Sequence, residues 1–448
     1  MKYRFLVILP LLLLAGCANP PASPDAIEKL SSEEAAKANP DLLGGLMYVY
    51  DYKAEPALTP APKGYKPFYV SHYGRHGARY ATNVQYKMVK KALDKAKEAG
   101  ALTEAGEKWL DEYSPFYEEA IYHDGELTGI GIEQKKTIAI RLASRFPEVF
   151  EGETHAAAIS TPVHRVILSM AAFIDGLQSV DKSFTADESY SESYSPILRP
   201  NFSPLSKGRP DNMDKMVAPY IDYFRETVDI KGIMGRIFVN PEEAVKAFGI
   251  DDILFIRHLS DIVNGLGCIS GQQTLFDGVF TEQDRIDVAR AAWYRLHLFL
   301  TRYKDSASLF PDYSAYTLKD IVDKTEEDIA SGKVQIRLRF SHDSAVIPLL
   351  ALMNIDGLGE VAETPQEAFD IFPMWEMPMG GSLQMIFYRD RRGKDVLVKL
   401  LRNEKEAAIP ITPVEGPYYR WSDVKEYCDN RIGSSLAKIE MLVNNANN

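Results

Sequence analysis

The feature of this sequence that most limits its fold is a repeated pairing of a short strand pattern with a helical pattern. Lys66–Ser71 is a run of β-branched and aromatic residues that stops near Gly74, and Ala156–Ser160 is a second short apolar run. Each run is followed by residues with helical spacing, at 83–100 and at Arg165–Leu177. Because this alternation builds parallel sheets covered by helices, we expect an α/β sandwich.

The middle of the chain breaks this alternation. Residues 181–330 contain a series of helical patterns, whereas Val334–Phe340 returns to a strand pattern and Ser422–Val443 ends the chain as an amphipathic helix. We therefore predict a three-layer sandwich around a mainly parallel sheet, formed by residues 51–180 and 331–448. Residues 181–330 are predicted to be an inserted, mainly helical cap domain.

The N-terminus has the pattern of an export signal. Basic residues come first, a short apolar run follows, and the segment ends in LAGC at 14–17. A membrane-spanning helix needs about 20 apolar residues, so this run is too short to be one. The ending resembles the lipobox of bacterial lipoproteins, which implies cleavage after residue 16 and lipidation of Cys17; an ordinary secretory signal is the alternative. We expect a signal peptide at 1–16, a tether and N-terminal arm at 17–50, and a lipid anchor in the bacterial cell envelope as the sole membrane contact.

The charge and cysteine content exclude several classes of protein. The chain has 51 Lys and Arg residues against 63 Asp and Glu residues, a formal net charge of −12. Nucleic-acid binding relies on broad basic surfaces, so we expect no nucleic-acid partner, and an anionic ligand must be bound by a local cluster of cations. Three cysteines exclude a disulfide scaffold. Cys268 and Cys428 either form a disulfide or stay as buried free thiols.

Polar residues suited to phosphate chemistry follow three of the predicted strands. GRHGAR at 74–79 follows the first strand, Arg165 follows the second, and His342 and Asp343 follow the strand that ends at residue 340. Ligands of open α/β sheets bind beyond the carboxyl ends of the strands, so we expect these side chains to converge. Arginine matches phosphate oxygens, a neutral imidazole can attack phosphorus, and a carboxylic acid can protonate a leaving group. Taken singly, each motif is more often an exposed loop or a surface ion pair.

These motifs resemble those of the acid-phosphatase branch of the histidine phosphatase superfamily, which includes histidine acid phosphatases, phytases and multiple inositol polyphosphate phosphatases. RHGAR at 75–79 matches the opening motif of the family, 160–177 resembles its second arginine segment, and His342-Asp343 matches its late motif. GELT at 125–128 is similar to the Gly-x-Leu-Thr element of the family.

The resemblance implies a role for each residue. His76 would form a phosphohistidine, and Asp343 would protonate the leaving alcohol. The phosphate would be held by Arg75, Arg79, Arg165 and His342. The other histidines have no spacing suited to zinc, so neither a metal nor another cofactor is expected.

We therefore expect a metal-independent phosphomonoesterase whose partner is a phosphorylated small molecule, with inositol polyphosphates such as phytate as the favoured substrates. A broad-specificity acid phosphatase acting on sugar or other organic phosphates is the near alternative. A lipoprotein that binds phosphorylated ligands without turnover is the alternative from another class. The late motif reads His-Asp-Ser at 342–344, where the polyphosphate phosphatase subgroup has His-Ala-Glu, whereas 398–410 is similar to that subgroup.

Overall fold

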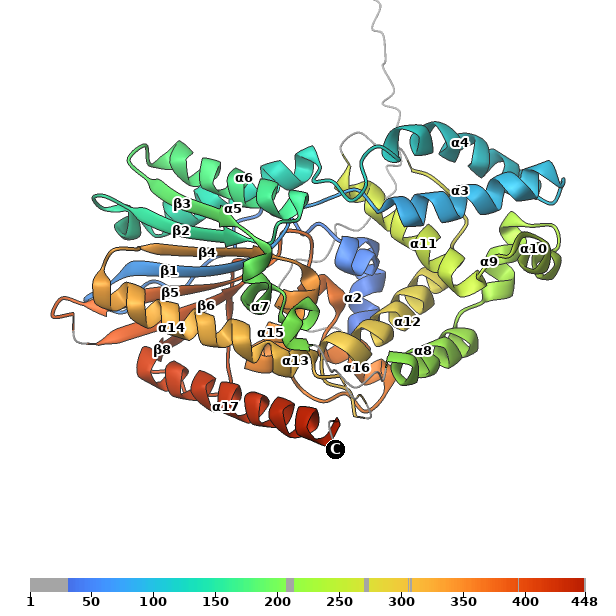
Figure 1. Cartoon of the computed structure of the whole chain (residues 1–448). Helices are drawn as coiled ribbons and strands as arrows, with labels where there is room; N and C mark the ends of the chain where they lie inside the picture. The colour runs from blue at the N-terminus through green and yellow to red at the C-terminus, as the bar shows by residue number, and fades with distance from the viewer. Residues whose placement is uncertain are drawn as a thin grey trace, which may run out of the picture.

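A mixed sheet organises the chain, with helices on both of its faces and a large helical region at one end (Figure 1). The computed structural model describes residues 31–206, 213–269, 274–304, 306, 308–393 and 395–446. The predicted signal peptide at 1–16 and the predicted lipidation site at Cys17 lie outside the described residues.

Eight strands of the described chain form the sheet, in the order β3-β2-β4-β1-β5-β6-β7, with β8 paired to β6. The strands β1 to β4 pair in parallel, whereas β5 to β8 are antiparallel to their neighbours. Their bounds are β1 (Tyr65–Arg75), β2 (His155–Ser160), β3 (Thr185–Tyr190), β4 (Ile336–Ser341), β5 (Ser382–Asp390), β6 (Val396–Arg402), β7 (Lys405–Ala407) and β8 (Tyr418–Arg420).

Two layers of helices cover the sheet, which confirms the predicted three-layer α/β sandwich. One layer is α5 (Gly129–Arg145) and α6 (His164–Val180), and the other is α14 (Ala315–Ser331), α15 (Asp343–Met353) and α17 (Trp421–Ala446). Adjacent residues of β1 illustrate the burial on both faces. Val70 packs in the apolar cluster shared with α5 and α6, whereas Tyr69 packs in the larger cluster on the opposite face, as the alternation of strand side chains requires.

The helical region, called the cap below, is larger than predicted. Its main helices are α3 (Asn83–Glu98), α4 (Glu104–Ala120), α8 (Met213–Thr227), α9 (Ile230–Ile237), α10 (Pro241–Phe248), α11 (Asp252–Gly265) and α12 (Glu282–Leu300). The cap also includes the shorter helices α2 (Ser32–Ala38) and α16 (Pro365–Ile371), whereas α7 (Ser195–Leu198) and α13 (Phe310–Tyr313) are short helices that pack on the sandwich. Turns of 3₁₀ helix occur at Pro40–Met47, Pro147–Phe150, Glu192–Tyr194, Pro200–Phe202, Pro204–Ser206, Leu266–Cys268, Ile355–Gly357 and Met374–Glu376.

The predicted domain boundaries need correction in three places. Helices α3 and α4 lie within the predicted core segment 51–180, but α3 packs on α11 and α4 packs on α9, so both belong to the cap. Conversely, β3 and α14 lie within the predicted cap segment 181–330, yet β3 extends the sheet beside β2 and α14 packs on α17. The predicted tether and N-terminal arm at 17–50 is folded from residue 32 onward. Its 3₁₀ helix at Pro40–Met47 packs against α11 and α12, and α2 packs on that 3₁₀ helix.

The described residues settle two further points. Cys268 and Cys428 are both free and buried, so the disulfide alternative is wrong. None of the described helices combines the length and the hydrophobicity that crossing a bilayer requires.

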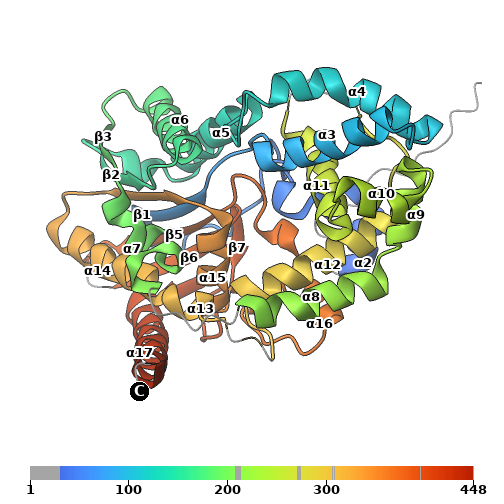
Figure 2. The same cartoon turned by 45° about the vertical axis from the view of Figure 1, so that its right-hand side comes forward.

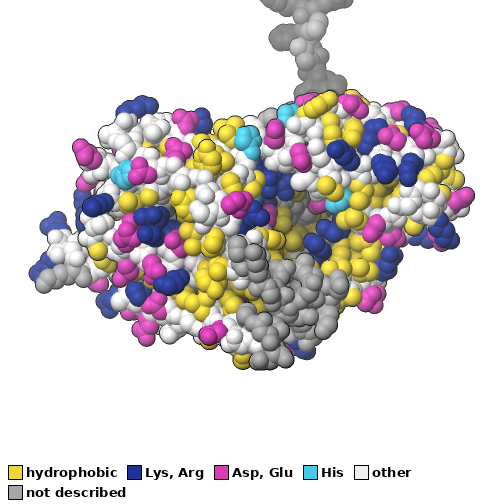
Figure 3. All heavy atoms as spheres, viewed as in Figure 1, with side chains coloured by type: hydrophobic (Ala, Val, Ile, Leu, Met, Phe, Trp, Pro, Cys, Tyr) yellow, Lys and Arg dark blue, Asp and Glu magenta, His cyan; other side chains and the backbone are white. Residues whose placement is uncertain are grey.

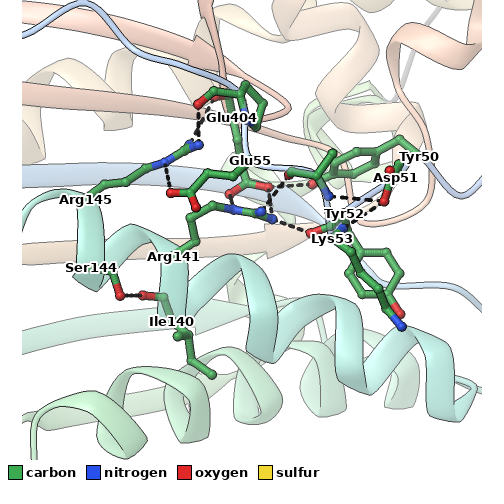
Figure 4. Close-up of polar contacts among 12 residues, drawn as sticks. Tyr50, Asp51, Tyr52, Lys53, Glu55, Ile140, Arg141, Ser144, Arg145 and Glu404 are labelled. Atoms are coloured by element: carbon green, nitrogen blue, oxygen red, sulfur yellow. Dashed lines mark hydrogen bonds and ion pairs between the residues drawn. The ribbon is translucent and has the colours of Figure 1, made fainter. Parts of the chain in front are cut away.

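A buried ion pair fastens the segment before β1 to the sandwich (Figure 4). Arg141 of α5 donates from Nε and Nη2 to the two carboxylate oxygens of Glu404, at 2.7 and 3.0 Å. The same guanidinium donates to the backbone oxygens of Ala54, at 2.6 Å, and Tyr52. Glu404 has a φ of +66° in the turn between β6 and β7, and Tyr50 donates to its carboxylate. One ion pair therefore joins α5, the β6–β7 turn and residues 50–54.

We expect Arg141→Met to lower the free energy of unfolding by about 3–5 kcal/mol, because it leaves the buried carboxylate of Glu404 without its counter-charge. Equilibrium denaturation by urea measures this change. The double variant Arg141→Met/Glu404→Met should recover part of the loss. Glu55→Gln is the matched control: it breaks the pair with Arg145 but removes a charge that is 65% exposed, so its effect should be at most about 1 kcal/mol. Equal losses in Arg141→Met and Glu55→Gln would contradict this account.

Candidate active site

Three neighbouring parallel strands deliver the predicted site residues to one edge of the sheet. In the register of β1 and β4, Arg75 lies opposite Ser341, and β2 ends at Ser160 beside the same strand. The rings of His76 and His342 therefore lie 5.6 Å apart between their centroids. Figure 2 shows the chain leaving the sheet after β1 and entering the cap at α3, so this edge faces the cap.

The motif loop is held by direct backbone packing against α5. A Cβ atom on Gly77 would lie 2.5 Å from the carbonyl oxygen of Gly131, so both positions require the absence of a side chain. Thr128 caps α5 by accepting from the Gly131 N–H at 3.1 Å, and its hydroxyl donates to the Ala78 oxygen at 3.1 Å. Ser169 of α6 accepts from the Gly77 N–H at 3.0 Å. The Gly-x-Leu-Thr element thus positions the motif loop.

Two further residues of α5 hold the segment behind the motif loop, and sequence reasoning missed both. The Gln134 amide donates to the Met379 oxygen at 2.6 Å, and the ammonium of Lys135 donates to the Gly380 oxygen at 2.9 Å. Lys135 is buried, and this burial, with the charge of Arg75, lowers the pKa of its ammonium to about 7. A lysine in an amphipathic helix is expected on the exposed face. Nothing in the sequence therefore indicates that Lys135 makes this buried contact.

Arg75 is a fully buried cation at the end of β1. Its Nη2 atom lies 2.7 Å from Oδ2 of Asp343, the first residue of α15, and its Nη1 atom donates to the Met377 oxygen at 2.9 Å. Burial raises the pKa of the Asp343 carboxyl, but the charges of Arg75 and Arg79 outweigh burial and lower it below its usual range. Asp343 is therefore ionised while the site is empty of anions.

The His76 imidazole has one free ring nitrogen. Its Nδ1 atom lies 2.9 Å from the Gly77 carbonyl oxygen, which can only accept, so Nδ1 carries the hydrogen and the lone pair is on Nε2. Burial holds the pKa of the imidazole well below its ordinary value, and the charges of Arg75 and Arg79 add to this. His342 contacts Thr161 at 3.2 Å, and burial with the charge of Arg165 lowers its pKa to about 3. Both rings are neutral in mildly acidic medium.

Three more arginines surround these rings, and one of them was not predicted. Burial and the charge of Arg79 lower the pKa of Arg165 to about 10. Arg199, after α7, is close enough for its charge to lower the pKa of both Arg165 and His342. In the described part of the chain, none of Arg79, Arg165 and Arg199 pairs with a carboxylate, and the Nε atoms of Arg79 and Arg165 are buried without a hydrogen-bond partner. The site therefore holds an excess of positive charge that suits an anion.

Arg199 was missed because it does not directly follow a predicted strand. It comes after the short helix α7, which is separated from the end of β3 at Tyr190 by a 3₁₀ turn. The structure thus brings together all six predicted residues of the reaction centre and adds Arg199 to them.

The sheet, the cap and the cluster of histidines and arginines at the strand ends fit the family that a comparison with known proteins identifies. The model of the histidine phosphatase superfamily (branch 2) matches residues 74–218 and 244–403, and the chain belongs to that family. This confirms the resemblance that the motifs indicated.

Individual relatives are distant. The chain is 23% identical over 317 residues to human multiple inositol polyphosphate phosphatase 1, covering 62% of this chain and 61% of that protein. The chicken protein of the same name is 24% identical over 310 residues, covering 66% of each. The chain thus matches less than two thirds of the length of these two relatives.

Two solved structures share the fold. A multiple inositol polyphosphate phosphatase of Bifidobacterium longum, in complex with inositol hexasulfate, has a TM-score of 0.69 at 16% identity, covering 83% of this chain and 95% of that one. A phytase from D. castellii has a TM-score of 0.67 at 16% identity, covering 92% and 90%.

We expect Arg165→Lys to lower kcat/KM for phosphate esters by at least about tenfold, because lysine keeps the charge but loses the planar fork that matches two phosphate oxygens. Steady-state phosphate release measures the effect. Arg225→Lys, in an exposed ion pair with Asp252 of the cap, is the control and should leave kcat/KM unchanged. Unaltered kinetics in Arg165→Lys would assign Arg165 a role in folding alone.

Proposed function

We propose that the protein hydrolyses inositol polyphosphates such as phytate, one phosphate at a time, through a phosphohistidine formed on His76. The observation that carries this proposal is a buried, neutral imidazole with a free Nε2 lone pair, whose neighbours include Arg79 and Arg165, which form no ion pair with a carboxylate of the described chain. The names of the human and chicken relatives support the substrate class. The lipid anchor at Cys17 and the placement in the cell envelope stay predictions.

The first step transfers the phosphoryl group to His76. Nε2 attacks phosphorus, a P–N bond forms, and the bond from phosphorus to the ester oxygen breaks with its electrons on that oxygen. Charge in the transition state is spread over three equatorial oxygens, which Arg79, Arg165 and His342 can hold from different sides. A neutral His342 can donate one hydrogen bond to such an oxygen.

The leaving oxygen needs a proton, and Asp343 is ionised before the substrate arrives. A bound phosphate brings negative charge beside Asp343 and competes with it for Arg75, and both effects raise the pKa of the carboxyl. Phosphate monoesters lose their second proton with a pKa of about 6. In acidic medium the substrate monoanion therefore carries a proton into the site, and Asp343 can take it up and pass it to the leaving alcohol.

The second step returns the site to its starting state. Water attacks phosphorus, the P–N bond breaks, and the Asp343 carboxylate accepts a proton from the water. Inorganic phosphate leaves as its monoanion and takes this proton from Asp343, so Asp343 is again ionised and His76 is again neutral. Because the substrate supplies the proton of the first step, activity falls as the pH rises above about 6.

We expect rapid acid-free quenching during turnover of a ³²P-labelled ester to trap a base-stable, acid-labile phosphate on His76, because phosphoramidates of histidine hydrolyse in acid. His76→Ala should lose the label and at least about 10³-fold in turnover. His155→Gln is the matched control, since His155 begins β2 at the end of the strand away from the site. Label on a serine, or no label in a single turnover, would contradict the proposal.

We expect Asp343→Asn to slow the phosphorylation step on phytate by about 10²–10⁴-fold, and much less on nitrophenyl phosphate. An inositol alkoxide needs a proton as its bond to phosphorus breaks, whereas nitrophenolate is a stable leaving group. The step is measured as a burst or in a single turnover, so that water activation does not contribute. Equal slowing on both substrates would show that Asp343 is not the proton donor.

A further inference from the structure

Lys135 of α5 is a buried cation that forms no ion pair with a carboxylate of the described chain. Figure 3 shows other Lys and Arg side chains on the surface and around the hollow between the sandwich and the cap, whereas Lys135 is 1% exposed. Its ammonium donates to the Gly380 oxygen at 2.9 Å. The Glu404 carboxylate, whose charge acts on Lys135, is paired with Arg141. Removing an unpaired charge from water costs folding free energy, so stability alone does not explain this lysine.

The oxygen that accepts from this ammonium belongs to the segment 377–381, called the strap below. The strap contacts both residues that begin the motif. The Gly380 N–H donates to the His76 oxygen at 2.9 Å, and the Arg75 N–H donates to the Gly381 oxygen at 2.9 Å. The Arg75 guanidinium donates to a further carbonyl of the strap. The backbone of His76 and the guanidinium of Arg75 are therefore placed by the strap.

On its other side, the strap approaches α5 too closely to admit a side chain. Gly380 has a φ of +77°, and a Cβ atom there would lie 2.3 Å from Cδ of Gln134. Gln134 donates to the Met379 oxygen at 2.6 Å, and the Met379 N–H donates to the Tyr48 oxygen at 2.8 Å. Of the two hydrogen bonds that α5 donates to the strap, the one from Lys135 is charge-assisted and therefore the stronger.

Phosphoryl transfer to His76 depends on positions of this kind. The reacting atoms must lie about 3–3.5 Å apart and in line, and a displacement of about 1 Å caused by a change away from them can slow a reaction about 100-fold. The His76 ring is tied to the motif backbone, because its Nδ1 atom donates to the Gly77 oxygen. A displaced strap would therefore move Nε2 of His76 and the guanidinium of Arg75 together.

We infer that Lys135 is a positioning residue for phosphoryl transfer. Its ammonium holds the strap against the motif loop and so fixes the places of the His76 ring and the Arg75 guanidinium. Lys135 itself touches neither the substrate nor the reacting atoms. The inference rests on the proposed function, in which His76 receives the phosphoryl group. It accounts for a buried cation that stability alone does not explain.

The test is Lys135→Met, which keeps the length of the side chain but removes its charge and its donor. We expect kcat for nitrophenyl phosphate to fall about 10- to 100-fold and KM to change less than about twofold, because the ammonium acts from behind the motif loop. The midpoint of urea denaturation should change little, since the cost of burying the ammonium disappears together with its hydrogen bond. Lys135→Gln keeps an N–H donor and should recover part of kcat. Lys136→Met is the matched control: it removes the next lysine of α5, which is 44% exposed and pairs with Asp175, and should change neither kcat nor the midpoint.

Amide hydrogen exchange of the strap, followed by mass spectrometry, gives a second readout that does not depend on turnover. The N–H groups of Met379, Gly380 and Gly381 are all hydrogen-bonded, so they exchange only when the strap opens locally. In Lys135→Met we expect these amides to exchange at least about tenfold faster, because a charge-assisted hydrogen bond is lost. The amides of β4 should keep their rates.

An unchanged kcat in Lys135→Met overturns the inference, and so does a lower kcat with unchanged exchange of the strap. If Lys135→Met does not fold, Lys135→Gln carries the same two measurements, and a loss of kcat in both variants that only follows a loss of folded protein also overturns the inference. Failure of the proposed function has a different result: no label is trapped on His76 of the unaltered protein, whereas the effect of Lys135→Met on exchange of the strap remains.

Discussion

A guanidinium group that has no contact with solvent must find its compensation inside the protein, and Arg75 imposes this requirement on the whole reaction centre. Its charge is balanced by Asp343 at 2.7 Å and by the Met377 oxygen at 2.9 Å. Removing one partner of such a pair is strongly unfavourable because a buried charge is left alone. The start of α15 and the segment after residue 376 are therefore held against the end of β1. Since β1 also pairs with β4 and β5, the contact between Arg75 and Asp343 lies where three strands and α15 meet.

In the proposed reaction, the Arg75–Asp343 ion pair couples phosphate binding to the protonation of Asp343. An incoming phosphate would offer Arg75 a second anionic partner and so weaken its contact with the Asp343 carboxyl. Burial lowers the pKa of the His76 imidazole, and the charges of Arg75 and Arg79 lower it further, so the ring stays neutral where an isolated histidine would be charged. A chain with a net charge of −12 thus maintains a small region of opposite sign, which a low local dielectric strengthens.

The reaction centre was predictable from sequence because its residues occupy the ends of strongly patterned strands. Arg75, His76, Arg165 and His342 each follow an apolar run, and the sheet topology brings such ends together. Arg199 was missed because it follows the short helix α7 and not a strand with a hydrophobic pattern. The cap boundaries were missed for another reason. Helical spacing shows that α3 has an apolar face, but it does not show that this face meets α11 and not the sheet.

The interleaving of cap and sandwich along the chain affects how the protein can reach its fold. Cap helices come from four separate stretches, 32–47, 83–120, 213–300 and 365–376, with sheet strands between them. Neither part is a continuous segment, so neither is complete until residues far apart in the chain have met. Contacts of long sequence separation must pay loop-closure entropy before they stabilise anything, and they slow folding. A ribosome-bound fragment that ends before β4 lacks the strand that lies between β1 and β2. The edge of the sheet that faces the cap is therefore incomplete in that fragment. The reaction centre is therefore assembled late in folding, after most of the chain has been synthesised.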